Sequence, residues 1–171
     1  MTENENLINL DNPKIQKIRD ILSNVFDPEI PVLSIIDLGI LRNIRLENEV
    51  FIIEITPTYN GCPAMNVIEW AMKAALDDAQ IQHYVIHTIL SPAWTTDWMT
   101  EEGKTKLREY GIAPPATKAR IRKMFDPQEL VSCPRCNSNQ THLVSEYGST
   151  ACKSMYRCMN CLEPFDYFKC H

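Results

Sequence analysis

Several features that mark common protein classes are missing from this chain of 171 residues. Only 5 residues are glycine, and the sequence contains no glycine-rich fingerprint of the kind that holds nucleotide phosphates. Glu-x-x-His pairs, from which helical bundles build di-iron sites, are also absent. A nucleotide-dependent enzyme or a di-iron helical bundle is therefore not expected.

Long apolar runs are missing as well. The longest stop well before the ~20 residues that span a bilayer, so we expect no membrane helix. The N-terminal residues are rich in acidic and amide side chains and lack the basic start and apolar centre of a signal peptide. These absences predict a cytoplasmic protein.

Basic residues are too few to favour binding to nucleic acid. The chain has 17 Lys and Arg against 22 Asp and Glu, a formal net charge of -5. Attraction to a phosphate backbone requires clustered Lys and Arg. We expect no nucleic-acid partner, and the oligomeric state is left open.

Cysteine is distributed unevenly, which predicts two domains of unequal size. Six of the seven cysteines lie at or after Cys133, among few aliphatic residues. Domains of about 40 residues usually need a metal or disulfides to hold their fold. We assign residues 12–112 to an α/β domain, 113–130 to a basic linker and 131–171 to a small cysteine-rich domain.

The first domain is expected to be α+β, with helices on a small three-stranded sheet. Asn12-Pro13 is typical of a helix start, and apolar residues then recur at helical spacing to about Asn24. Cys62-Pro63 opens a second helix, with Val67 assigned to its apolar face. Further predicted elements are strands at 40–46, 50–56 and 84–90 and a short helix at 100–110.

Two C-x2-C pairs, Cys133 with Cys136 and Cys158 with Cys161, are the strongest signal in the sequence. Each pair can form a tight turn that presents two thiolates from one side, and two such turns complete a tetrahedral shell of four sulfur atoms. Zinc is the favoured ion, in a structural role, while a single iron or an iron-sulfur cluster is the alternative. A reducing compartment disfavours the other explanation, a pair of disulfides.

Three further residues of this domain have no assigned ligand role. Cys152 and Cys170 are interpreted as small buried side chains and His171 as a solvated chain end. The alternative is that one of the two cysteines replaces a ligand or helps to hold a cluster. The first interpretation is the favoured one.

Cys62 is the only cysteine of the first domain. At the start of a helix, unpaired backbone N–H groups and the helix dipole favour the thiolate form. This position makes Cys62 a candidate reactive residue, although a cysteine after a turn is also often a simple buried side chain. Met65 stands where a C-x-x-C redox pair would need a second thiol.

Asp37 is the second candidate residue because its neighbours are aliphatic. A buried carboxylate must find hydrogen-bond donors. One interpretation is that Asp37 fixes its own loop by accepting backbone N–H bonds. The functional alternative is that Asp37 faces Cys62 and a bound metal or partner.

Four short motifs lie in the first domain: DPEIP at 27–31, IDLG at 36–39, TP at 56–57 and GCP at 61–63. Together they resemble the signature of the iron-sulfur assembly domain of SufT-like proteins, over residues 13–100. The stretches WTTDWM at 94–99, GIAPP at 111–115, GSTACK at 148–153 and FDYFKC at 165–170 extend the resemblance to the PaaD family of bacterial phenylacetic acid degradation.

The resemblance implies an accessory role in a multicomponent oxygenase that epoxidises the ring of phenylacetyl-CoA. By position, Asp37 and Cys62 would form the functional pair, with Cys62 transiently holding iron or a cluster during maturation. The implied partners are the other oxygenase subunits, above all the iron-sulfur reductase. The alternatives are a structural docking subunit without transfer chemistry and a zinc-ribbon-like nucleic-acid binder.

Overall fold

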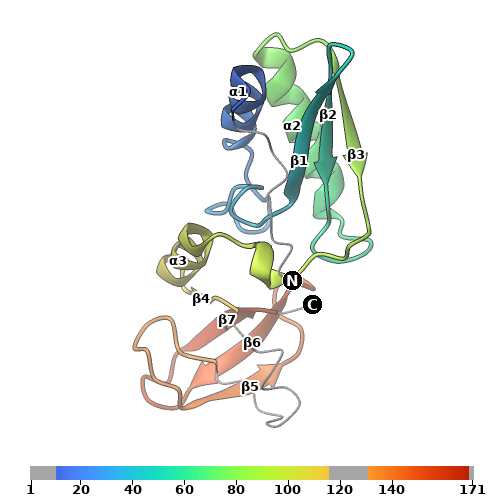
Figure 1. Ribbon diagram of the computed structural model, residues 1–171. Coiled ribbons are helices and arrows are strands. Elements are labelled where there is room, and N and C mark those ends of the chain that lie inside the picture. The colour runs from blue at the N-terminus through green and yellow to red at the C-terminus, as the bar shows by residue number, and fades with distance from the viewer. Residues whose placement is uncertain (1–10, 116–130, 170–171) are drawn as a thin grey trace, which may run out of the picture. The chain divides into compact units, whose positions relative to one another are not determined.

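The computed structural model describes residues 11–115 and 131–169, and the chain forms two compact units, Met1–Thr100 and Glu101–His171 (Figure 1). The first unit contains α1 (Pro13–Leu22), β1 (Leu41–Glu47), β2 (Val50–Ile55), α2 (Ala64–Asp78), β3 (Tyr84–Thr88) and the 3-10 helix η1 (Thr96–Trp98). The second contains α3 (Glu101–Tyr110), β4 (Ile112–Ala113), β5 (Thr141–Ser145), β6 (Lys153–Cys158) and β7 (Pro164–Phe168). The predicted α+β class is confirmed.

The first unit is a three-stranded sheet in the order β1-β2-β3, with β1 antiparallel and β3 parallel to β2. Figure 1 shows α1 and α2 on one face of this sheet, where the two helices pack on each other. The two-residue turn between β1 and β2 has positive φ at both Asn48 and Glu49. Such a turn matches the twist of a hairpin, which confirms the hairpin predicted here.

The core of the first unit comes from one side of the sheet and from the facing sides of the helices. Ile53 and Ile55 alternate along β2 and are fully buried, as the strand period of two requires. The loop between α1 and β1 adds Ile30, Leu33 and Ile35, all at most 1% exposed. That loop is therefore an ordered part of the core.

One helix face differs from its prediction. Val67 was expected on the apolar face of α2, yet it is 51% exposed. The buried positions of α2 repeat every four residues, and Val67 precedes one of them by a single residue, which turns it toward solvent. These buried positions are Ala64, Ile68, Met72 and Leu76.

The second unit is built on a four-stranded sheet in the order β4-β7-β6-β5. β4 pairs in parallel with β7, and the other neighbours are antiparallel. Because of the β4 pairing, Ile112 and Ala113 belong with the second unit, as does α3, which packs on β4. The first compact unit thus ends at Thr100, whereas the sequence placed the domain end at residue 112 and the linker at 113–130.

Most of that proposed linker, residues 116–130, lies outside the described part of the chain, and so do Cys170 and His171. Within the residues that the structure describes, no helix combines the length and the apolar character that a membrane crossing requires.

Candidate metal centre and cysteine site

The four cysteines of the two C-x2-C pairs come together in the second unit. The sulfur atoms of Cys133, Cys136, Cys158 and Cys161 all lie within 4.8 Å of one another. The Sγ atoms of Cys133 and Cys161 are 3.7 Å apart, and those of Cys136 and Cys158 are 3.6 Å apart. A tetrahedral ion with metal–sulfur bonds of about 2.3 Å places its ligand sulfurs about 3.8 Å apart. The residues therefore fit one four-coordinate metal ion.

Tight backbone turns present these thiols. In the first turn, the N–H of Cys133 donates to the carbonyl of Ser138, and the N–H of Asn137 donates to the carbonyl of Cys133, each at 2.9 Å. Asn137 has a φ of +59°, a conformation that asparagine adopts more readily than most residues. The turn thus bends back within five residues and directs both sulfurs to one side.

The second turn also supplies hydrogen-bond donors to sulfur. The backbone N–H groups of Asn160 and Cys161 donate to Cys158 Sγ at 3.4 and 3.5 Å. The side-chain amide of Asn160 donates to Cys136 Sγ at 3.8 Å. Donors of this kind stabilise negative charge on sulfur, so the turn favours thiolates before any ion is considered.

When no cation is present, the hydrogen bonds that the thiols share make ionisation easier at Cys158 and harder at Cys161. The N–H of Cys161 is the main cause that lowers the pKa of Cys158 to about 6, and the N–H of Asn160 adds to it. For Cys161, the N–H of Glu163 lowers the pKa, but burial and the other sulfur atoms of the group outweigh it and raise the pKa to about 12. A bound cation removes this difference because it stabilises all four thiolates.

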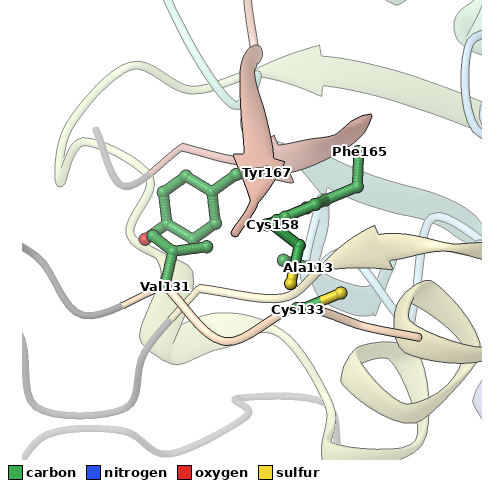
Figure 2. Close-up of a cluster of buried hydrophobic side chains, with 6 residues drawn as sticks. All are labelled: Ala113, Val131, Cys133, Cys158, Phe165 and Tyr167. Carbon is green, nitrogen blue, oxygen red and sulfur yellow. The ribbon is translucent and has the colours of Figure 1, made fainter. Parts of the chain in front are cut away.

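The buried cluster of the second unit continues directly from this centre. Cys133 and Cys158 are fully buried, and their sulfur atoms lie beside Ala113 of β4 (Figure 2). Val131, Phe165 and Tyr167 complete the cluster. Two of the four metal ligands are thus part of the apolar core of this unit, whereas Cys136 is exposed and Cys161 is partly buried at its edge.

Cys152 lies outside this group, although it is only 5% exposed. Its Sγ atom is 3.0 Å from the hydroxyl oxygen of Thr150, a residue of the turn that leads into β6. Its surroundings are those of a small buried side chain, the first of the two interpretations drawn from the sequence.

Cys62, the candidate reactive residue of the first unit, lies just before α2. Its N–H donates to the carbonyl of Tyr59 at 3.3 Å, and its carbonyl accepts from the N–H of Met65 at 3.2 Å. The helix has Pro63 as its N-cap and begins at Ala64, one residue later than expected. The thiol is free and partly exposed, so a reactant in solution can approach it.

Asp37, the other candidate, is 5% exposed in the loop between α1 and β1. Its Oδ2 accepts from the backbone N–H of Ser34 at 3.0 Å and from the Ser34 hydroxyl at 2.9 Å. Its Oδ1 accepts from the hydroxyl of Thr100 at 3.2 Å. These bonds agree with the interpretation that Asp37 fixes its own loop.

Two families of known proteins match this chain, one within each of its two compact units. Residues 15–81 match the family model of iron-sulfur cluster assembly proteins, and residues 117–169 match the PaaD zinc beta ribbon domain. A protein of Escherichia coli (strain K12), assigned to 1,2-phenylacetyl-CoA epoxidase as one of its subunits, is 49% identical over 158 residues. The match covers 92% of this chain and 94% of that protein. The chain belongs to the PaaD family.

The assembly domain of this PaaD-family chain has relatives of its own. The Fe-S protein maturation auxiliary factor YitW of Bacillus subtilis (strain 168) is 31% identical over 94 residues, covering 54% of this chain and 91% of that protein. A crystallised domain of unknown function from Bacillus anthracis is 25% identical, with a TM-score of 0.50. Its match covers 54% of this chain and 89% of that domain. The crystallised domain supports the fold of the first unit.

Sequence reasoning missed two residues that support the sites of this PaaD-family chain. Asn160 donates hydrogen bonds to two of the sulfurs and lies inside the second C-x2-C pair. Its position next to a ligand could have indicated this role. Thr100, which donates to Asp37, is 63 residues away along the chain, and no local pattern links the two.

Proposed function

We propose that this chain is an accessory subunit of a multicomponent oxygenase that epoxidises the ring of phenylacetyl-CoA, and that it assists assembly of the iron-sulfur or metal centres of that oxygenase. The main support is the 49% identity to the Escherichia coli epoxidase protein over 92% of the chain. The match of residues 15–81 to iron-sulfur cluster assembly proteins supports the maturation role.

In this proposal Cys62 holds iron or a cluster transiently, or engages the client protein. Its partly exposed thiol at the start of α2 is available for such a contact. The iron-sulfur reductase of the oxygenase is the proposed client, because it is the component that needs a cluster. The four-cysteine unit would dock on that client.

We further propose that the ion of the four-cysteine centre is zinc in a structural role. Four thiolates form a closed shell, which leaves no position for a water molecule or a substrate. A multi-iron cluster distributes its thiolates over several metal atoms, whereas the four sulfurs here lie within 4.8 Å of one another. That spacing favours a single ion, and zinc is the common ion of such ribbons.

The test is co-expression of the oxygenase subunits with the wild-type chain, with Cys62→Ala, or without the chain. We expect Cys62→Ala to lower the iron and sulfide content and the activity of the purified oxygenase to the level obtained without the chain. Asn60→Ala, an exposed neighbour in the same turn, is the matched control and is expected to behave as wild type. Unchanged cluster content with Cys62→Ala would refute the proposed role of this thiol.

A stoichiometric structural subunit is the second candidate function. The relative that supports it is itself assigned as part of the epoxidase, and its sequence is covered almost entirely. The same preparations distinguish the two roles. A structural subunit would co-purify with the oxygenase at a fixed ratio, and Cys62→Ala would leave both that ratio and the activity intact.

A further inference from the structure

The segment 94–100 is fastened to the loop that carries Asp37. The indole N–H of Trp94 donates to the carbonyl of Leu38 at 2.9 Å. The backbone N–H of Thr100 donates to the carbonyl of Asp37 at 3.0 Å, and the Thr100 hydroxyl donates to the Asp37 carboxylate at 3.2 Å. Both ends of the segment are thus hydrogen-bonded to two consecutive residues of the loop.

The middle of the segment packs closely against residues at the end of the loop and the start of β1. The guanidinium of Arg42 lies 3.4 Å from the ring centroid of Trp98, a cation–π contact. Gly39 has a φ of +68°, and a Cβ atom at this position would lie only 2.4 Å from the carbonyl oxygen of Trp98. Trp94 and Met99 are each 4% exposed. The segment and the loop therefore form one packed layer of the first unit.

Both carboxylate oxygens of Asp37 take part in this arrangement. Oδ2 accepts two bonds from Ser34 inside the loop, and Oδ1 accepts from Thr100 in the segment. Asp37 is 5% exposed as a residue, so these donors and not bulk water are the main polar partners of its carboxylate. A group that binds a metal ion or takes up a proton must present a lone pair to its reactant, and protein donors occupy three of the roughly four acceptor positions of this carboxylate.

We propose that Asp37 is a positioning residue: its carboxylate holds segment 94–100 on the loop of the first unit and does not itself act on iron, a cluster or Cys62. Thr100 is the last residue of the first unit, and α3 begins at the next residue. Asp37 thereby fixes the point at which the chain leaves the assembly domain toward the metal-binding unit. The inference does not depend on the proposed function, because the isolated, metal-loaded chain tests it.

Two substitutions at the same position separate positioning from chemistry. In Asp37→Asn, the amide oxygen can still accept from Ser34, and the amide nitrogen can donate to the Thr100 hydroxyl, so the arrangement is preserved. In Asp37→Ala, all side-chain bonds are lost. A base would be lost in both variants and a carboxylate metal ligand would be weakened in both, because an amide takes up no proton at neutral pH and carries no negative charge.

Two measurements report on the segment: the rate of amide hydrogen exchange over residues 94–100 and the wavelength of tryptophan fluorescence. Of the three tryptophans, Trp94 and Trp98 belong to the segment, and Trp70 is 71% exposed, so the background Trp70→Phe isolates the segment signal. We expect Asp37→Ala to speed exchange over 94–100 on the order of a hundredfold and to shift emission to the red. Asp37→Asn should stay close to wild type.

Thr100→Val removes only the hydroxyl that donates to Asp37, and it keeps the test decisive if Asp37→Ala does not fold. It should speed exchange of the segment by roughly fivefold, and its effect should disappear when Asp37→Ala is already present. Asp97→Ala, an exposed carboxylate of the same segment, is the control and should change neither signal. Wild-type exchange in Thr100→Val, or equal damage by Asp37→Asn and Asp37→Ala, would overturn the proposal.

Discussion

The two units of this chain reach a stable fold by different means. The first unit buries aliphatic side chains from its helices, its sheet and its ordered loop, with Ile18, Leu22, Ile53 and Ile55 all fully buried. Burying a side chain of this size contributes about 1.5–3 kcal/mol. A unit with many such residues needs no ion to stay folded.

The second unit has a much smaller apolar cluster, and two of its four metal ligands are part of it. Cys133 and Cys158 lie among Ala113, Val131, Phe165 and Tyr167 in this cluster (Figure 2). Without an ion, four ionised cysteines would hold like charges within 4.8 Å of one another, and four protonated ones would leave polar sulfurs in and beside a small core. The comparison indicates that apolar burial stabilises one unit and metal coordination the other.

Removal of the metal should therefore give the largest difference in stability between the two units. We expect a strong chelator under reducing conditions to cost the second unit roughly 10 kcal/mol of folding free energy, enough to unfold it. Amide resonances of residues 131–169 should collapse to random-coil positions, while those of α1, α2 and the first sheet keep their dispersion. Added zinc should restore them, and elemental analysis of the protein purified without oxygen identifies the native ion.

Matched cysteine variants show whether the bound ion, and not the thiols as such, stabilises the fold of the second unit. Cys136→Ser should lose the metal and unfold the second unit in the same way. Cys152→Ala, outside the ligand group, should retain a full equivalent of metal. A second unit that stays folded after complete metal removal would contradict the comparison.

Local patterns in the sequence predicted the elements that depend on neighbouring residues. Asn12-Pro13 starts α1 as expected, and the Asn12 side chain accepts from the Lys14 N–H at 3.0 Å. The four-cysteine group was found for the same reason, because each turn is encoded within four residues and the ion supplies the link between the turns.

Features that depend on distant pairing could not be predicted. β4 is only two residues long, and its place in the second unit is decided by β7, more than fifty residues later. The bonds from Thr100 to Asp37 likewise join residues far apart in the chain. Neither pairing leaves a periodic pattern, so the sequence placed the first domain boundary beyond Thr100 and left two roles open for Asp37.

A cavity in the first unit gives the next largest effect. Ile53→Ala should lower the free energy of unfolding of this unit by about 2–5 kcal/mol, because Ile53 is fully buried where β2 faces the helices. Val85→Ala on β3, 41% exposed in the wild type, is the control and should cost less than about 0.5 kcal/mol. Denaturant unfolding of the metal-loaded protein measures both, and the metal content should not change.

The smallest effect concerns a single helix end in the first unit. Asn12→Ala removes the oxygen that caps the Lys14 N–H and should cost about 1 kcal/mol. Asn12→Asp keeps an acceptor at the N-terminus of α1 and should retain most of the stability. Because α1 packs on α2 and β1, the loss should appear in the unfolding of the first unit with or without metal. If the loss appeared only in metal-free protein, the two units would not be independent in stability, and metal binding would have to support the first unit as well.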